Sequence, residues 1–361
     1  ISITMRTEGS KRVRRSLKIR LIAFNLLTAF AIAACQPPTT QPSNETISTA
    51  AANPADCRTI QHAMGVTEVC GQPQRIVVLG PFFLEPLLAL DIQPIGYGDH
   101  AVFHQGDYTD PSQQIPYLGN RITQPLANVG SVYAPSTEAI LKLQPDLILG
   151  FKGNDYETLS RIAPTVLLED RFDAEQNLRT IAQAVNGTEQ AEQLLMQTQQ
   201  QVTAARETFA ALAATHSQVA LLSSSELRDI RLANPNEPCG ALIKALGFQF
   251  VFPPGVNKDE VSTYTPISLE TLPQLNEADL VILLGHNFSD LEQLDSIERF
   301  EAQQLSKLKQ AWEENAIAQS LDASQAGRVY FIPIYLCRGL PGAIGTELYL
   351  EELKEQLLAP N

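Results

Sequence analysis

The sequence predicts an α/β protein of two Rossmann-like lobes, each built on a central parallel sheet, joined by one long α-helix. Residues 188–215 contain neither Gly nor Pro, and their apolar and small residues are spaced 4, 3, 4, 3, 4 and 3 positions apart. This spacing is that of one helix face and does not fit a strand. On both sides of this stretch, short apolar runs alternate with short helical segments, which favours parallel sheets covered by helices.

The long helix is predicted to reach beyond one lobe. At 1.5 Å per residue it spans roughly 40 Å, which is more than the width of a small α/β domain. Thr188 is a suitable N-cap, and Glu189 and Glu192 suit the positive end of the helix dipole. The predicted buried stripe consists of Ala191, Leu195, Thr198, Val202, Ala205, Phe209 and Leu212.

The segment before the long helix follows a strand, loop and helix order. Residues 75–80 form a short β-branched run that ends in Gly, residues 85–90 indicate a helix, and residues 91–98 return as a second strand. Residues 135–150 then predict a helix, a Pro-Asp turn and a buried strand. We assign residues 57–186 to an N-terminal lobe.

The segment after the long helix repeats this order. Residues 218–222 predict a strand, and residues 239–246 predict a helix. We therefore assign residues 187–216 to the connecting helix and residues 217–361 to a C-terminal lobe of similar design.

One short motif occurs in each lobe. Ser136-x-Glu138 is followed by Asp-Leu-Ile-Leu-Gly, and Ser268-x-Glu270 is followed by Asp-Leu-Val-Ile-Leu-Leu-Gly. Ligands of open parallel sheets bind beyond the carboxyl ends of the strands. The loops of both lobes are therefore expected to face one cleft.

The charge distribution argues against nucleic acid as a partner. The formal net charge is −14, but seven of the 26 basic residues and only one of the 40 acidic residues lie before position 35. The rest of the chain carries 19 basic and 39 acidic side chains, a balance of −20. Binding to phosphate backbones depends on clustered Lys and Arg, so no nucleic-acid partner is expected.

The N-terminus has the features of an export signal. Six basic residues between positions 11 and 20 precede an apolar run over residues 21–34, which is short for a bilayer span. The small residues before Cys35 resemble a bacterial lipobox, in which the Cys is acylated. Residues 1–34 are therefore predicted to be a lipoprotein signal peptide. A plain signal peptide cleaved after Ala34 is the alternative.

The N-terminal residues also bear on the export route and on the membrane anchor. Arg14 and Arg15 sit in a stretch that resembles a twin-arginine motif, but such basic pairs are common before apolar runs, so the Sec and Tat routes both stay open. Residues 35–56 have almost nothing to bury and predict a flexible tether with an end-to-end distance of roughly 25 Å. A lipid on Cys35 would hold the protein on the periplasmic or extracytoplasmic face of the membrane.

The cysteines suit an oxidising compartment. Four remain besides Cys35, and they allow three pairings between which the sequence does not decide. We prefer Cys57 with Cys70 and Cys239 with Cys337. A tetracysteine metal site is the competing interpretation, which the absence of a CxxC motif and of clustered His disfavours.

The common catalytic motifs are absent from the sequence. It contains no GxSxG, GxxxxGKS/T or HExxH motif, and the run after residue 75 lacks GxGxxG. We therefore expect a binding protein without a cofactor, and an exported α/β enzyme is the alternative of another class.

The motif Ser136-x-Glu138 with Pro145-Asp146-Leu-Ile-Leu-Gly150, the motif's second copy, the long helix and the export signal together resemble a known family. They are similar to the substrate-binding lipoproteins of ABC importers for ferric siderophores, cobalamin and haem. The resemblance covers roughly residues 57–361. It implies a bilobal monomer whose helical connection permits only small lobe motions, and which delivers its ligand to a permease dimer in the membrane.

The resemblance also implies which residues bind the permease. In that family a Glu in each Ser-x-Glu motif docks into basic pockets of the permease, which corresponds to Glu138 and Glu270 here. The alternative is that each Glu only stabilises the N-terminus of its own helix.

A ferric siderophore is the expected ligand, with haem or cobalamin as alternatives. Arginines bind planar oxyanions bidentately and stay charged, so a cleft of arginines and aromatic rings suits an anionic, partly aromatic or carboxylate-bearing chelate. No direct metal ligation is expected, although two His lie four residues apart. The candidate ligand-binding residues in the predicted cleft loops are Tyr97, His100, Phe103, His104, Tyr108, Lys152, Tyr156, Arg228, Arg231, His286, Tyr335 and Arg338, with Phe82, Phe83, Phe151 and Asn234 beside them.

Overall fold

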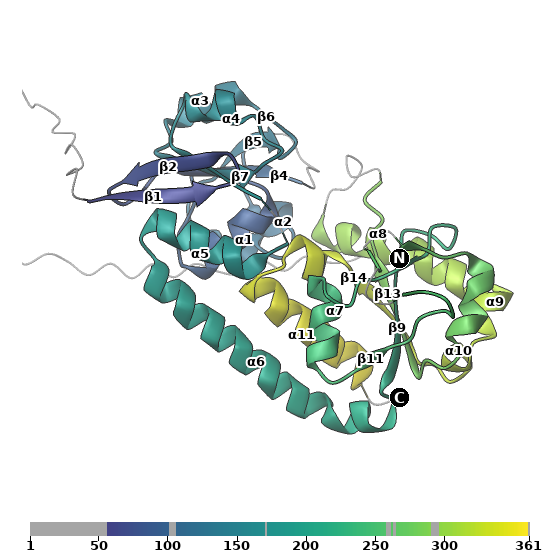
Figure 1. Cartoon of the computed structure of the whole chain (residues 1–361). Helices are drawn as coiled ribbons and strands as arrows, with labels where there is room; N and C mark the ends of the chain where they lie inside the picture. Colours follow the sequence, from purple (N-terminus) through teal and green to yellow (C-terminus); the bar gives the residue numbers. More distant parts are fainter. Residues whose placement is uncertain are drawn as a thin grey trace, which may run out of the picture. The chain divides into compact units, whose positions relative to one another are not determined.

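Figure 1 shows the computed structural model of the chain. It describes residues 56–100, 106–169, 172–257, 261–262, 265–289 and 296–359. The predicted signal peptide, the lipidation site Cys35, the tether up to residue 55, and Phe103 and His104 lie outside the described residues. Residues 51–361 form one compact unit, and its described part contains two six-stranded sheets connected by one long helix, besides a separate two-stranded hairpin. The predicted fold class is confirmed.

The N-terminal lobe is built on a six-stranded sheet of order β6-β5-β4-β3-β7-β8. Its strands pair in parallel except β6, which is antiparallel to β5. The strands β3, β7 and β8 are nearly continuous buried apolar runs, because helices cover both faces of a parallel sheet, whereas β5 and β6 at one edge are mostly half-buried. They are β3 (Ile76–Leu79), β4 (Gly96–Asp99), β5 (Ala127–Ser131), β6 (Ala134–Pro135), β7 (Leu147–Phe151) and β8 (Thr165–Leu168).

Short helices surround this sheet, and a separate hairpin precedes it. The first helix starts four residues before the predicted one, since Pro81 at its first position suits a helix N-terminus. The helices are α1 (Pro81–Ala89), α2 (Pro111–Gln114), the 3₁₀ turn η2 (Gly119–Arg121), α3 (Thr137–Leu143), α4 (Tyr156–Ser160) and α5 (Ala174–Val185). The hairpin consists of β1 (Cys57–His62) and β2 (Gly65–Cys70).

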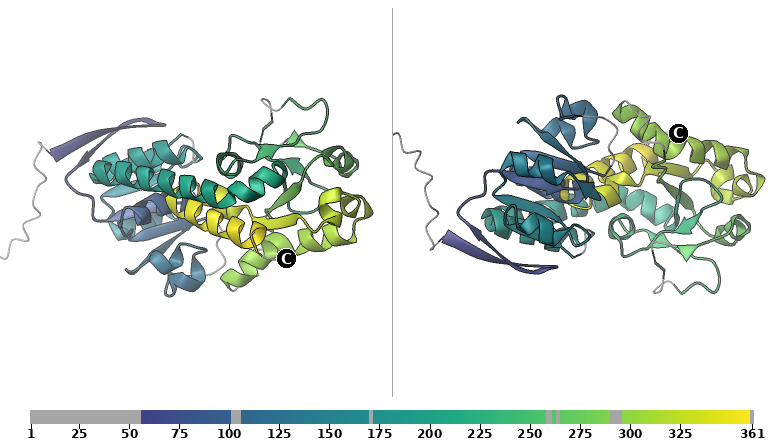
Figure 2. Two further views of the ribbon diagram at one scale, coloured as in Figure 1. Left: turned by 90° about the horizontal axis from the view of Figure 1, so that it is seen from below. Right: turned by 90° about the horizontal axis from the view of Figure 1, so that it is seen from above.

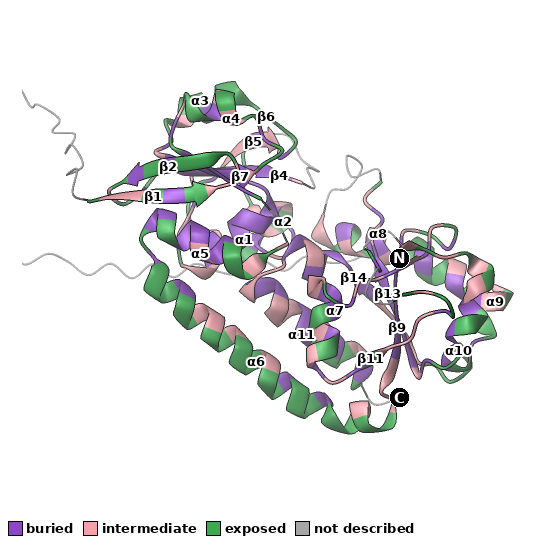
Figure 3. Ribbon diagram, viewed as in Figure 1, coloured by how far each residue is buried: buried purple, intermediate pink, exposed green. Residues whose placement is uncertain are grey.

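The long helix α6 (Thr188–Thr215) has the predicted bounds. Its N-cap is Gly187 rather than Thr188, which is the first helical residue and caps nothing with its side chain. Every member of the predicted stripe is buried or half-buried, while most of the remaining surface of α6 is exposed (Figure 3).

The two ends of α6 pack against different lobes. Ala191 packs with Leu178 and Ala182 of the N-terminal lobe. Ala205 and Phe209 instead join the core of the C-terminal lobe. The further views in Figure 2 agree with the contacts in placing α6 beside the last helix of the chain, α11 (Ala343–Leu357).

The C-terminal lobe has a six-stranded sheet of order β12-β10-β9-β13-β14, with β11 also paired to β9. Its central strands are parallel, as predicted, whereas the short strands β10 and β12 are antiparallel. The strands are β9 (Gln218–Ser224), β10 (Arg231–Leu232), β11 (Gln249–Phe250), β12 (Thr265–Pro266), β13 (Leu280–Gly285) and β14 (Val329–Pro333). Besides α11, the helices are α7 (Pro238–Ala245), the 3₁₀ helix η3 (Leu269–Leu275), α8 (Ile297–Glu314), α9 (Ala316–Gln319), α10 (Asp322–Gln325) and the π-helix η5 (Tyr335–Gly339).

The repeated Ser-x-Glu motif folds differently in the two lobes. Ser136 caps α3 by accepting a hydrogen bond from the Ala139 N–H at 3.2 Å. Ser268 instead faces the Thr271 hydroxyl, and Pro273 lies inside the following 3₁₀ helix. The second copy forms a 3₁₀ helix where the first is α-helical, because in an α-helix the ring of Pro273 would clash with the carbonyl four residues earlier.

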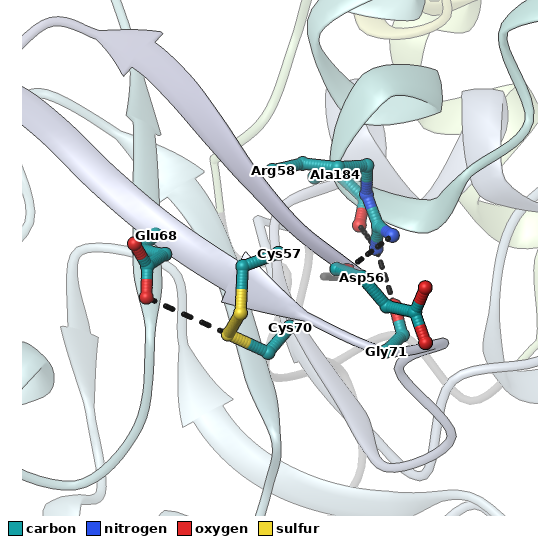
Figure 4. Close-up of a disulfide and its surroundings, with 7 residues drawn as sticks. All are labelled: Asp56, Cys57, Arg58, Glu68, Cys70, Gly71 and Ala184. Atoms are coloured by element: carbon teal, nitrogen blue, oxygen red, sulfur yellow. Dashed lines mark hydrogen bonds between the residues drawn. A yellow bond between two sulfur atoms is a disulfide. The ribbon is translucent and has the colours of Figure 1, made fainter. Parts of the chain in front are cut away.

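The structure contains both disulfides of the preferred pairing. Cys57–Cys70 closes the β1–β2 hairpin, and the neighbouring Arg58 donates hydrogen bonds to the carbonyls of Gly71 and Ala184 (Figure 4). Cys239–Cys337 joins the start of α7 to η5. Among the described residues, the one cluster of three metal-ligating types contains the first of these pairs, whose sulfurs are already bonded to each other.

No helix in the described residues is both long and apolar enough to span a bilayer.

Candidate functional site

A cavity of about 240 Å³ is lined by residues of both lobes. Several of its residues lie at or just after the carboxyl end of a strand: His100 follows β4, His286 follows β13, and Ile334 follows β14. This is where ligands of open parallel sheets bind. The lining residues are Phe82, His100, Tyr133 and Phe172 of the N-terminal lobe, and Ser223, Arg231, His286, Phe288, Ile334, Tyr335, Arg338 and Gly339 of the C-terminal lobe.

Aromatic rings from the two lobes meet across this cavity. The His100 ring lies 5.6 Å from Phe288 and 5.9 Å from Tyr133, in edge-to-face arrangements with both. Phe82 and Phe172 form a further edge-to-face pair at 6.0 Å. The N-terminal lobe therefore contributes mainly aromatic surface, which suits the apolar part of a ligand.

The positive charge of the cavity comes from the C-terminal lobe. The carboxylate of Asp229 accepts hydrogen bonds from Nε and Nη2 of Arg231 at 2.8–3.0 Å, which orients that guanidinium. The guanidinium of Arg338 lies 4.9 Å above the ring of Phe172. Burial, and less strongly the charges of both arginines, lower the pKa of His286, so this imidazole is neutral at neutral pH.

Tyr335 and Arg338 are presented by the π-helix η5. Such π turns occur frequently at functional sites. The ring of Tyr335 stacks on Tyr117 at 5.8 Å and meets Phe300 edge-on at 5.2 Å. A Cβ on Gly339 would lie 2.8 Å from the Tyr335 ring, so the glycine is what allows this close turn. Burial raises the pKa of Tyr335 well above its usual value, so its hydroxyl stays protonated.

Five of the predicted ligand residues line the cavity: His100, Arg231, His286, Tyr335 and Arg338. Two others, Tyr97 and Tyr108, are buried in the core of the N-terminal lobe, with their rings 5.6 Å apart. Tyr97 lies inside β4 rather than in the following loop, and its hydroxyl donates to the buried Asp99 at 2.9 Å.

Three more predicted residues lie outside the cavity. Lys152 is exposed and ion-paired with Glu169. The hydroxyl of Tyr156 lies 3.3 Å from Oγ1 of Thr67 on the β2 strand. Arg228 is exposed and does not line the cavity. Position after a strand does not fix the direction of a side chain, and these residues turn to other partners or to solvent.

Several lining residues are absent from the predicted ligand set: Tyr133, Phe172, Ser223, Phe288, Ile334 and Gly339. Phe288 and Ile334 follow β13 and β14 closely, so a stricter use of the carboxyl-end rule could have found them. Tyr133 and Phe172 come from loops whose course depends on tertiary packing, and the sequence carries no signal for them.

The two motif glutamates lie on the surface, away from the cavity. Glu138 is in the first turn of α3 and pairs with Lys142 at 2.7 Å. Glu270 is in the first turn of η3. The pKa of each is lowered, mainly by Lys142 for Glu138 and by a backbone hydrogen bond and Ser268 for Glu270, so both carboxylates are ionised.

Comparison with known proteins agrees with this architecture. YhfQ of Bacillus subtilis, named as an ABC transporter substrate-binding lipoprotein, is 26% identical over 313 residues, which cover 83% of this chain and 88% of YhfQ. The Fe(3+)-citrate-binding protein YfmC of the same organism is 26% identical over 282 residues, or 76% of this chain and 78% of YfmC.

A solved structure shares the fold. Staphylococcus aureus SirA, crystallised with staphyloferrin B, superposes with a TM-score of 0.65 at 24% identity, covering 83% of this chain and 98% of SirA. The family model for periplasmic binding proteins matches residues 76–336. The chain therefore belongs to the periplasmic binding protein family.

Proposed function

We propose that this chain is the extracytoplasmic substrate-binding protein of an ABC importer and that it captures a ferric siderophore between its lobes. The observation that carries the proposal is the pair Arg231 and Arg338 among aromatic rings, in a cavity lined by both lobes. Guanidinium groups recognise carboxylates bidentately, and aromatic rings cover apolar ligand surface. Capture and delivery need no covalent chemistry, so we propose binding rather than catalysis.

Within this class, a compact, carboxylate-bearing chelate is the best match. The cavity of about 240 Å³ is small beside the roughly 300–1,000 Å³ of typical ligand pockets. The name of the relative YfmC refers to ferric citrate, and SirA was crystallised with staphyloferrin B. These ligands belong to those proteins, and the citrate of YfmC together with the arginines of this cavity supports a carboxylate chelate here.

A binding screen tests the proposal. Purified protein is titrated with ferric citrate, a ferric hydroxamate, a ferric catecholate, haemin and cobalamin, with calorimetry as the readout. Tryptophan fluorescence is a poor probe, since Trp312 is buried beside Phe331 and does not line the cavity. We expect submicromolar binding of a carboxylate chelate and no turnover. Submicromolar binding of haemin or cobalamin alone, or turnover of a substrate, would refute the proposal.

We further propose that Glu138 and Glu270 dock the protein onto the permease. Two exposed carboxylates on equivalent motifs of two lobes suit a two-fold symmetric partner that presents basic residues. The double variant Glu138→Arg with Glu270→Arg should abolish uptake of iron by cells while the affinity for the chelate stays that of the wild type. Exposed Glu157 of α4, which pairs with Arg161, provides the control for charge reversal. Normal uptake by the double variant would disprove docking through these residues.

For export we propose residues 1–34 as the signal peptide, residues 35–56 as the tether, and acylation of Cys35 as the membrane anchor of a monomer. A Cys35→Ala variant should move from the membrane fraction to the soluble fraction and no longer incorporate labelled palmitate. Membrane association that persists without label would contradict the acylation.

A further inference from the structure

Glu85 is a buried carboxyl group that connects the two lobes. It lies on α1 of the N-terminal lobe and is 1% exposed. Its Oε2 accepts a hydrogen bond from the N–H of Gly342 at 2.8 Å, and its Oε1 accepts one from the N–H of Gly345 at 2.8 Å. Both donors belong to the start of α11 in the C-terminal lobe, where N–H groups lack partners within the helix.

The start of α11 is shaped to receive this carboxyl group. A Cβ on Gly342 would lie 3.0 Å from the carboxyl carbon and both oxygens of Glu85. A Cβ on Gly345 would lie 1.7 Å from the carbonyl oxygen of Leu340. Glycine at these two positions lets the chain turn into α11 tightly enough for both N–H groups to reach one carboxyl group.

Both ends of this contact are continuous with the ligand cavity. Phe82 precedes Glu85 by three residues on α1, hence on the same helix face, and lines the cavity. Gly342 follows η5 by three residues, and η5 carries Tyr335 and Arg338. The contact between Glu85 and α11 therefore ties one wall of the cavity to the other.

We infer that Glu85 is a positioning residue for the ligand cavity: by holding the start of α11, its carboxyl group fixes the η5 segment, with Tyr335 and Arg338, opposite Phe82. The inference rests on the proposed function, because it assumes that the ligand binds in this cavity. Glu85 itself does not line the cavity; it affects binding by setting the position of one cavity wall relative to the other.

Because Glu85 can ionise, its role predicts a pH dependence of ligand affinity, which a contact without a titratable group would not produce. Burial raises its pKa to about 7, and the N–H groups of α11 offset part of this increase. Nearby Arg121, which pairs with Glu347 of α11, also lowers the pKa. Glu85 also lines a second cavity. There α5 contributes the acidic residue Glu175, and α6 contributes only uncharged residues.

The sign of the pH effect follows from this raised pKa. When the contact between Glu85 and the start of α11 opens, the carboxyl group becomes hydrated and returns toward its ordinary pKa of about 4.5. The joined arrangement therefore binds a proton more tightly than the separated one between about pH 4.5 and 7. The joined arrangement is favoured below this window and weakened as the pH rises through 7, so ligand affinity should fall from about pH 6 to about pH 8.

The test compares four variants with the wild type in calorimetric titrations with ferric citrate at about pH 6 and about pH 8. Glu85→Gln replaces one acceptor oxygen by an NH2 group, which cannot accept a hydrogen bond. Gly342→Ala leaves the charge and pushes the carboxyl group away. Glu85→Asp keeps the charge but shortens the reach. Glu175→Gln is the matched control, since Glu175 lies in the same cavity but pairs with Arg179 of its own helix α5.

We expect Glu85→Gln to bind ferric citrate about tenfold more weakly than the wild type at pH 6. Its affinity should also change less between about pH 6 and about pH 8 than the affinity of Glu175→Gln, because the amide does not titrate. Glu85→Asp and Gly342→Ala should show smaller losses in the same direction. Comparing variants at equal pH cancels the effect of pH on the chelate itself. Variants that fold, as judged by circular dichroism, and bind as tightly as the wild type at both pH values would overturn the inference.

The inference can still be tested if Glu85→Gln does not fold. If Glu85→Gln does not fold, Gly342→Ala tests the same contact from the other lobe. Hydrogen exchange of the wild type adds an independent measurement: ligand should protect the amides of Gly342 and Gly345, and unchanged exchange there would contradict the inference. If the wild type binds none of the screened ligands, the proposed function fails instead.

Discussion

The two lobes share a design but contribute different chemistry to the cavity. The N-terminal lobe supplies Phe82, His100, Tyr133 and Phe172, which are rings without a permanent charge. The C-terminal lobe supplies both arginines of the cavity. Repetition of an α/β unit therefore fixes where a ligand can bind, whereas the loops at the strand ends decide what each half recognises.

The disulfides differ in the same way. Cys57–Cys70 ties a hairpin outside the cavity, and its two cysteines are 13 residues apart. Cys239–Cys337 closes a span of 98 residues and ends inside η5, next to Arg338. Of the two disulfides, only Cys239–Cys337 constrains the segment that carries a cavity arginine.

Removal of the second disulfide should have the largest effect on stability. By loop-closure entropy, the double variant Cys239→Ser with Cys337→Ser should lose about 5 kcal/mol in the free energy of unfolding, against about 3 kcal/mol for Cys57→Ser with Cys70→Ser. Urea denaturation measures both values. Affinity for the chelate should also fall in the first variant and stay unchanged in the second. Equal loss of affinity in both would show that η5 is not held by its disulfide.

Removal of the arginines should have the largest effect on binding. Hydrogen bonds from a charged donor are worth roughly 1.5–3 kcal/mol, so Arg231→Ala and Arg338→Ala should each weaken binding of a carboxylate chelate by about ten- to a hundredfold. The exposed Arg228 provides the matched control, because Arg228→Ala removes the same charge outside the cavity. An equal loss in all three variants would point to the overall charge of the lobe rather than to the cavity.

The aromatic wall of the N-terminal lobe should contribute less. Phe172→Leu keeps an apolar side chain but removes the ring below the Arg338 guanidinium. A cation–π contact of this kind is worth about 1 kcal/mol, so affinity should fall about fivefold. Isothermal titration calorimetry provides the measurement, and Phe331→Leu, whose ring packs on Trp312 away from the cavity, serves as the control. Unchanged affinity would assign the orientation of Arg338 to η5 alone.

The smallest expected effect concerns His286. Burial lowers its pKa, so the folded protein binds this proton less tightly than the unfolded chain. Its contribution to stability is present above the ordinary pKa of 6.5 and is lost as the pH falls through the lower folded value. Proton NMR should therefore give a titration midpoint below 6.5 in the free protein, and an anionic ligand should raise it. A midpoint at or above 6.5 without ligand would contradict the buried, neutral state.

Local patterns predicted the elements well where one physical constraint dominated. Residues 188–215 form one helix because the stripe repeats without a helix-breaking residue. The apolar runs at β7 and β13 are strands because they are short, β-prone and bounded by turns. The prediction was less accurate at 91–98, where the strand covers only Gly96–Asp99 and draws Tyr97 into the core.

The candidate site was predicted only in part, for a physical reason. The rule that ligands lie beyond the carboxyl ends of strands led to His100, His286 and Tyr335, but it does not say which way a loop turns. Lys152 and Tyr156 also follow a strand, and the structure pairs them with Glu169 and Thr67 instead. Among the described residues, such partners are set by packing between segments that are distant in the sequence.

Periodicity, turn residues and cysteine number act locally or by count, so the chain alone specifies two α/β lobes, the long helix between them, the pair of Ser-x-Glu motifs and four cysteines that can form two disulfides. Tertiary packing selects the disulfide pairing, brings arginines of one lobe opposite aromatic rings of the other, and places Glu85 against the start of α11. Glu85 is 257 positions from Gly342 and 260 positions from Gly345, so no local sequence signal connects them. Their hydrogen bonds exist only after both lobes have folded and packed together.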